Sequence, residues 1–145
     1  MKEFLNVFLI MLACALSSRG ETGVVKVGEC WSYQTRPAEE GSFVIIRKIE
    51  TLPKIGEVVH VSVCDLKLKT RKFGYADHID DLPILAASLR KSLSKKNARC
   101  PCEADWMAGY STWRKAYDAG RIQRYPAYPF PVSQCVSFIE RTMNE

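Results

Sequence analysis

The strongest structural signal in the chain is the stretch VVHVSVCDLKLK at residues 58–69. Apolar and polar side chains alternate along it, which predicts a β-strand with one face in a hydrophobic core. The apolar face would carry three valines, Val59, Val61 and Val63. The opposite face would carry His60, Ser62 and Cys64.

Shorter strand-like stretches precede this one, at residues 24–27, 30–35 and 42–50. They are rich in β-branched and aromatic residues, and Trp31 and Tyr33 would share one face of the second stretch. Turn-forming proline and glycine separate the stretches at residues 37–41 and 53–56. This spacing predicts a small antiparallel sheet of three to four strands.

The hydrophobic period changes after a predicted loop at residues 70–79. Apolar residues then recur at helical spacing from Leu82 to Leu93. Pro83 suits the first turn of this helix, and Asp80 or Asp81 would cap it.

Two further helices are predicted, one at residues 111–120 with Ser111 as its cap, and one that begins at Ser133. A small sheet followed by helices indicates an α+β fold. We therefore expect a single domain over residues 21–145, with about three helices covering one face of the sheet.

The composition excludes several classes of protein. The 145 residues are 47% apolar and 26% charged, which is typical of a globular domain and excludes long disorder. Phosphate-binding loops, zinc-protease motifs and dinucleotide-binding motifs do not occur, and we expect no cofactor. A net charge of +5 is too small to indicate a dedicated nucleic-acid binder.

The first 20 residues are typical of a secretory signal, because Lys2 is followed by an apolar run at residues 4–16 and then by small residues. Two processing routes remain open. Signal peptidase would release the domain, whereas lipid on Cys14 would tether it to a membrane. The prediction is a secreted or periplasmic protein, either free or anchored through that cysteine.

Five further cysteines predict two disulfides and one free thiol in an oxidising compartment. Cys100 and Cys102 are separated by one proline, so we expect no bond between them. The expected pairs are Cys30 with Cys64, and Cys135 with Cys102 or Cys100. A second interpretation makes Cys100 and Cys102 a redox or soft-metal site, although only two ligands are evident.

The stretch GECWSYQTRPAEEGS at residues 28–42 resembles the opening motif of a family of short, uncharacterised bacterial proteins. In that family a W-S-Y-x-T-R-P-x-E-E-x-S segment precedes two strands and a histidine-to-proline segment that leads into a helix. The resemblance extends over residues 28–93 and carries no activity that can be transferred.

Candidate binding residues are Trp31, Arg36, Glu39, Glu40 and His78. The loop at residues 36–40 could present a guanidinium and two carboxylates to a ligand, or those charges could pair with one another. His78 lies beside several aspartates that could orient its imidazole, although acids before a helix also serve as ordinary caps.

We expect a non-enzymatic protein that binds another protein of the envelope, for example as an inhibitor or an immunity-like partner. One alternative is a small hydrolase that uses His60 or His78 with the loop at residues 36–40. Another is a thiol or metal protein built on Cys100 and Cys102.

Overall fold

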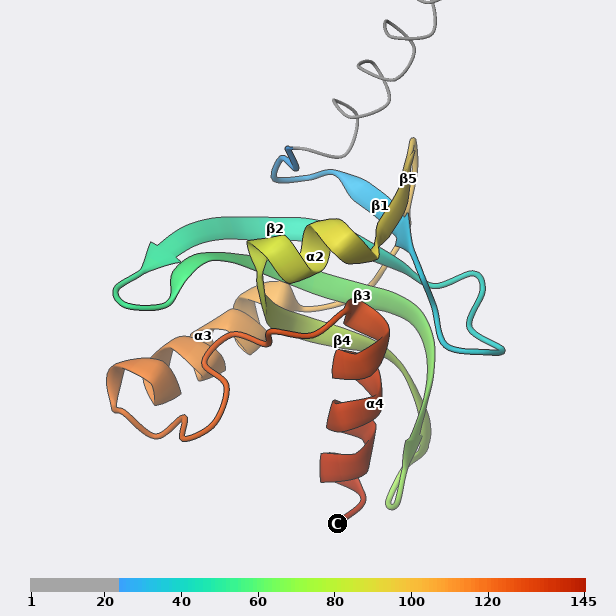
Figure 1. The fold of residues 1–145 in the computed structure, drawn as a ribbon. Coiled ribbons are helices and arrows are strands. Elements are labelled where there is room, and N and C mark those ends of the chain that lie inside the picture. The colour runs from blue at the N-terminus through green and yellow to red at the C-terminus, as the bar shows by residue number, and fades with distance from the viewer. Residues whose placement is uncertain (1–23) are drawn as a thin grey trace, which may run out of the picture.

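The computed structural model describes residues 24–145, which form an α+β fold (Figure 1). Within these residues a five-stranded antiparallel sheet has the order β4-β3-β2-β1-β5, so the predicted fold class is confirmed with more strands than expected. The strands are β1 (Cys30–Tyr33), β2 (Phe43–Leu52), β3 (Gly56–Thr70), β4 (Gly74–Leu85) and β5 (Leu93–Asn97). The helices are α2 (Ala86–Ser92), α3 (Trp106–Asp118) and α4 (Val132–Met143).

The central strand β3 confirms the alternation in its sequence. Val59, Val61 and Val63 are fully buried in the main hydrophobic core, which also contains Trp31 and Tyr33 from β1. Helices α2 and α4 close this core through Leu89, Val132, Cys135 and Val136.

The opposite face of the sheet carries His60, Ser62 and Cys64. The segment at residues 98–105 crosses this face and is bonded to Cys64 by a disulfide, so we call it the strap face. Helix α3 packs on this face: Trp113 and Tyr117 contact a second small cluster that includes Val58. The helices therefore lie on both faces, a departure from the expectation that all of them would cover one.

The region from residue 70 to residue 85 differs from the prediction of a loop and the start of a helix. From Gly74 to Leu85 this region is strand β4. Leu82 and Ile84 face the core, while Pro83 lies opposite His60 in β3. Proline is tolerated there because β4 is an edge strand, and its carbonyl still accepts a hydrogen bond from Tyr128 N–H at 2.9 Å. The helix begins only at Ala86, so neither predicted aspartate caps it.

Three smaller expectations are also corrected. Residues 24–27 form no strand, whereas residues 93–97 form the edge strand β5. Helix α3 begins before Ser111, and Asp105 caps it by accepting a hydrogen bond from Ala108 N–H. Helix α4 spans the predicted region but has no side-chain cap from Ser133.

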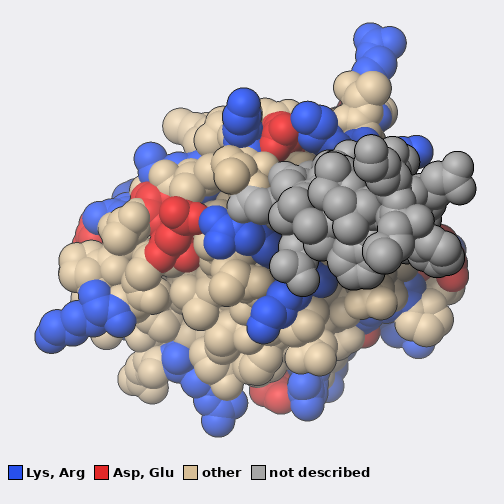
Figure 2. All heavy atoms as spheres, turned by 45° about the horizontal axis from the view of Figure 1, so that its top comes forward, with Lys and Arg blue, Asp and Glu red and all other residues tan. Residues whose placement is uncertain are grey.

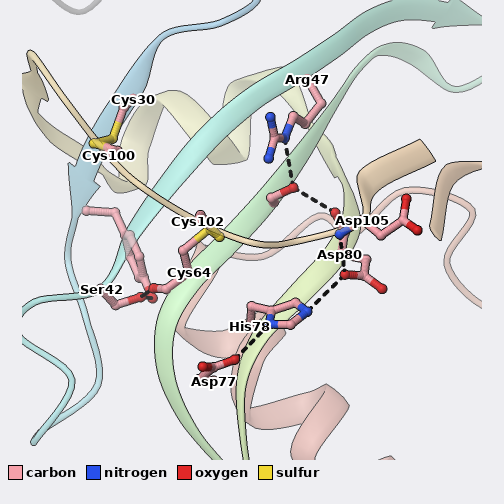
Figure 3. Close-up of a disulfide and its surroundings, with 12 residues drawn as sticks. Cys30, Ser42, Arg47, Cys64, Asp77, His78, Asp80, Cys100, Cys102 and Asp105 are labelled. Atoms are coloured by element: carbon pink, nitrogen blue, oxygen red, sulfur yellow. Dashed lines mark hydrogen bonds and ion pairs between the residues drawn. A yellow bond between two sulfur atoms is a disulfide. The ribbon is translucent and has the colours of Figure 1, made fainter. Parts of the chain in front are cut away.

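The segment at residues 98–105, which we call the strap, is bonded to the sheet by two disulfides (Figure 3). Cys30 pairs with Cys100, and Cys64 pairs with Cys102. The predicted Cys30–Cys64 bond is wrong because β2 separates β1 from β3, which places those strands about 10 Å apart, beyond the reach of a disulfide.

The pairing predicted for Cys135 is also wrong, because this residue is a free, buried cysteine on α4. Its thiol faces the core on the other side of the sheet from the strap, where no cysteine of residues 24–145 pairs with it. The expectations of two disulfides and one free thiol, and of no bond between Cys100 and Cys102, are confirmed for residues 24–145.

Candidate functional site

The loop between β1 and β2 places Arg36 at the centre of an ion-pair cluster. Its guanidinium donates to both carboxylate oxygens of Glu39, at 2.7 and 2.9 Å. It also donates to Glu140 of α4, at 3.1 and 3.4 Å. Of the two interpretations of this loop, the structure favours charges that pair with one another, and we call the three residues the Arg36 clamp.

The Arg36 clamp replaces a missing strand partner of β3. Strand β3 continues past Cys64, whereas its neighbour β2 begins at Phe43, directly opposite that cysteine. The amide N–H groups of Lys67 and Lys69 then donate to Glu39 at 2.7 Å and to Glu140 at 2.8 Å. Hydrogen bonds from amides to charged acceptors are stronger than those to neutral ones, so the clamp stabilises the overhanging part of β3.

The charges of the clamp are held in their ionised forms. Burial raises the pKa of Glu39, but hydrogen bonds from Arg36 and from Lys67 N–H outweigh it and hold that pKa below its ordinary value. The same balance lowers the pKa of Glu140. The hydrogen bond to Glu39 raises the pKa of Arg36 although burial opposes it, so the guanidinium stays charged.

The other residues of the W-S-Y motif are also structural. Trp31 is 5% exposed and lies in the core. Tyr33 Oη lies 2.7 Å from Ser42 Oγ, which donates in turn to Cys64 O at 2.7 Å. Burial raises the pKa of Tyr33 to about 12. Glu40 is exposed, and it accepts a hydrogen bond from Ala38 N–H.

His60 is fully buried on the strap face between α3 and the sheet. Its Nδ1 lies 3.0 Å from Asp81 Oδ1, and its ring meets Tyr110 and Trp113 edge to face. Its Nε2 has no hydrogen-bond partner in the part of the chain that the structure describes, and lies 3.6 Å from Glu50 Oε1, which pairs with Arg114 at 3.1 Å. The cluster joins α3 to β2, β3 and β4.

His78 lies at the rim of the same face, where its ring bridges two carboxylates (Figure 3). Nδ1 is 2.7 Å from Asp77 Oδ1, and Nε2 is 3.0 Å from Asp80 Oδ1. The side chain is 35% exposed and borders a cavity of about 500 Å³ that also contacts Cys102 and Glu103. Both ring nitrogens of His78 are thus engaged by carboxylates, and among the described residues neither is bonded to a hydroxyl group.

The residues named for a hydrolase do not converge. The contacts of Arg36 share no residue with those of His60 or His78. Ser62 Oγ accepts a hydrogen bond from Arg47 Nε and donates one to the Asp80 carbonyl oxygen. This hydroxyl is therefore bonded to Arg47 and Asp80 and not to His60 or His78.

Both sulfurs of Cys100 and Cys102 are in disulfides, so the structure presents no free thiolate at this segment for a thiol or metal site. Free thiolates are the metal ligands and nucleophiles that such a site requires. Among residues 24–145 no group of three or more His, Cys, Asp or Glu side chains is arranged to hold a metal ion.

A feature that the sequence did not indicate is the turn between β3 and β4, residues 69–75, which we call the hairpin tip. Figure 1 shows it at the far end of the sheet, near the C-terminal end of α4. Phe73 is 86% exposed and Tyr75 is 68% exposed. The cations of the same turn, Lys69, Arg71 and Lys72, are also exposed; Lys69 lies opposite Tyr75 in the hairpin, and Arg71 donates to the Asn144 carbonyl. The pattern of aromatic and basic residues was readable, but their exposure depends on the hairpin.

Comparison of the chain with models of protein families, with curated proteins and with solved structures finds no match. Among the helices of residues 24–145, none has the length and apolar character needed to cross a bilayer. Residues 1–20 and Cys14, which carry the predictions of a signal peptide and a lipid anchor, lie outside the described residues.

Proposed function

We propose that this protein is an exported, disulfide-stabilised binding protein that engages the acidic surface of another protein through the hairpin tip. The observation that carries the proposal is the exposure of Phe73 and Tyr75 beside three cations. Aromatic and arginine side chains dominate the binding energy of protein interfaces, and large exposed apolar groups cost free energy unless a partner covers them. The partner we infer carries an apolar pocket with a carboxylate rim.

Export is supported by two kinds of observation. The two disulfides indicate an oxidising environment, extracellular or periplasmic. The order of charge, apolar run and small residues in the first 20 positions is typical of a secretory signal. In this proposal the domain is either released or held at a membrane by lipid on Cys14.

The hydrolase alternative is less well supported, because Arg36, His60 and His78 all serve contacts within the fold. An inhibitor or immunity-like role requires only a stable scaffold that presents a binding element. The Arg36 clamp bonds β3 next to the tip, and the Cys64–Cys102 disulfide bonds the same strand farther from the tip.

The test compares three forms of the tagged protein in capture from envelope extract. They are the wild type, the double variant Phe73→Ser/Tyr75→Ser, and the control Met107→Ser, which removes an exposed apolar side chain from α3. We expect one stoichiometric protein with the wild type and the control, released by salt, and its loss with the double variant. Equal capture by all three forms would overturn the proposed role of the tip.

A further inference from the structure

A cavity of about 770 Å³ lies at the end of the strap, away from the hairpin tip. It is bordered by the turn that precedes β1, by β2, by the end of β5 and by the first residues of the strap. Its charged lining residues are Lys26, Glu29, Arg47 and Lys96. Figure 2 looks onto the side of the molecule that carries β1 and β5 in Figure 1, and basic side chains far outnumber acidic ones there.

Arg47 borders this cavity at a β-bulge in β2. Ile46 lies opposite Val61 and Lys48 lies opposite His60, so Arg47 is an extra residue in β2 without a partner in β3. Because of this bulge, two consecutive side chains of β2, Arg47 and Lys48, lie on the strap face. Lys48, the next residue, stays on the same strap face, where its Nζ lies over the Tyr110 ring at 5.3 Å.

The Arg47 guanidinium has no carboxylate partner among the described residues. Nε donates to Ser62 Oγ at 2.9 Å, and that hydroxyl donates to Asp80 O at 2.8 Å, so the orientation of the guanidinium is fixed (Figure 3). Burial lowers the pKa of Arg47, and no ion pair opposes that effect. Within residues 24–145 its Nη donors have no acceptor, whereas Arg36 uses its Nη donors on two glutamates.

The charge around the cavity is unbalanced. The three cations face one carboxylate, that of Glu29, which already accepts from Lys26 N–H at 2.7 Å and pairs with Lys96 at 3.1 Å. A ligand with two negative charges would balance the excess. A phosphate monoester carries about that charge at neutral pH, and its oxygens match the fork of a guanidinium.

We propose that this cavity binds a phosphate monoester, with the Nη donors of Arg47 on the phosphate oxygens and Lys26 as the second cation. Asn97, which donates to Ser32 Oγ at 2.8 Å, forms part of the wall beside the phosphate. The site is separate from the hairpin tip, so it adds a small-molecule or headgroup ligand to a protein that binds another protein.

The test is a titration of the oxidised protein followed by the NMR signal of Arg47 Nε–Hε. Glycerol phosphate is the soluble probe, and acetate at matched ionic strength is the control anion. We expect saturable binding of glycerol phosphate that is at least tenfold tighter than that of acetate. A separate arm measures co-sedimentation with vesicles that contain phosphatidic acid, whose headgroup is a phosphate monoester.

The variants Arg47→Gln and Arg47→Lys are compared with Arg90→Gln, which removes the same charge from an exposed pair with Glu57. Binding should fall at least tenfold in Arg47→Gln, less in Arg47→Lys and not at all in Arg90→Gln; binding by the variants is followed by calorimetry. Should Arg47→Gln fail to fold, Lys26→Gln takes its place with an expected loss of about threefold.

The outcomes separate the two sources of phosphate and the two proposals. Binding of the soluble ester assigns a soluble ligand, and binding to vesicles alone assigns a lipid headgroup. Binding of neither probe, equal binding of acetate, or an unchanged affinity in Arg47→Gln overturns the phosphate site. The Phe73→Ser/Tyr75→Ser variant should keep phosphate binding, so failure of one proposal leaves the other testable.

Discussion

The Arg36 guanidinium connects a loop, a strand overhang and the last helix through two carboxylates. The Glu39 side chain is only 2% exposed, so its charge depends on the pairing. Replacing Arg36 with methionine should lower the free energy of unfolding by about 3–5 kcal/mol, because it leaves a buried carboxylate unpaired. Urea unfolding followed by circular dichroism measures the change.

Two controls separate the charge from the packing. Glu140→Gln removes a carboxylate that is 25% exposed and should cost about 1 kcal/mol or less. The double variant Arg36→Met/Glu39→Gln should recover part of the loss, because the unpaired charge is gone. A double variant less stable than Arg36→Met would show that Glu39 acts through shape and not through charge.

The Arg36 clamp also predicts how the free energy of unfolding depends on pH. The folded-state pKa of Glu39 lies below its ordinary value, so the unfolded chain binds protons more readily than the native one. The stabilising contribution is present above the ordinary glutamate pKa of about 4.3 and is lost as the pH falls through the lower folded-state pKa. Unfolding titrations between pH 7 and pH 2 should show a smaller acid destabilisation in Glu39→Gln than in the wild type. Equal slopes would contradict this.

Cys135 should behave as an inert thiol in the native protein. Burial raises its pKa to about 12, and the thiolate is the reactive form, so a thiol reagent at pH 8 should leave it unmodified. After denaturation without reductant the same reagent should label Cys135, and peptide mapping identifies it. Labelling of the native protein at this residue would show that α4 opens locally.

Residue-level prediction succeeded where partners are close in sequence. The pairing of Arg36 with Glu39 was one of two interpretations, because the residues are three apart in one loop. Glu140 could not be foreseen, since only the tertiary fold brings α4 to this loop across 104 positions. The same holds for Asp81, which reads as a helix cap and instead contacts His60 from the neighbouring strand.

At the scale of elements, the stretch at residues 78–85 was misassigned for an identifiable reason. Leu82 and Leu85 match a helical period with Leu89, but Leu82 and Ile84 also match a strand period, and pairing with β3 decides between them. By contrast β2 and β3 were predicted nearly in full, because β2 is rich in β-branched residues and apolar and polar residues alternate along β3 from Val59 onward.

The strand and helix assignments of residues 78–85 predict different losses of unfolding free energy when Asp81 is replaced. A helix cap would contribute about 1 kcal/mol, whereas the structure buries this side chain to 1% exposure against His60. Asp81→Ala should therefore lower the free energy of unfolding by about 3–5 kcal/mol, as expected for breaking a buried pair. The neighbouring control Asp77→Ala, whose side chain is 84% exposed, should cost less than about 1 kcal/mol. Equal costs for the two variants would favour the cap.

At the scale of the whole molecule, the strap joins the segment that follows β5 to strands β1 and β3. One disulfide closes a sequence separation of 70 residues and the other a separation of 38, and both bond the strap to the sheet. Cysteine arithmetic predicted the number of bonds, but the partners depend on strand order, which no local pattern encodes.

Removal of either bond should destabilise the protein by about 2–4 kcal/mol, because each cross-link restricts a long loop in the unfolded chain. The paired variants Cys30→Ser/Cys100→Ser and Cys64→Ser/Cys102→Ser test the bonds singly, and reductant tests them together. The second variant should also loosen the rim around His78, since Cys102 borders that cavity. Mass spectrometry of unreduced peptides from protein recovered outside the cytosol should find Cys30 linked to Cys100 and Cys64 linked to Cys102. Protein found in the cytosol with all of these sulfurs reduced would contradict both the pairing and the proposed export.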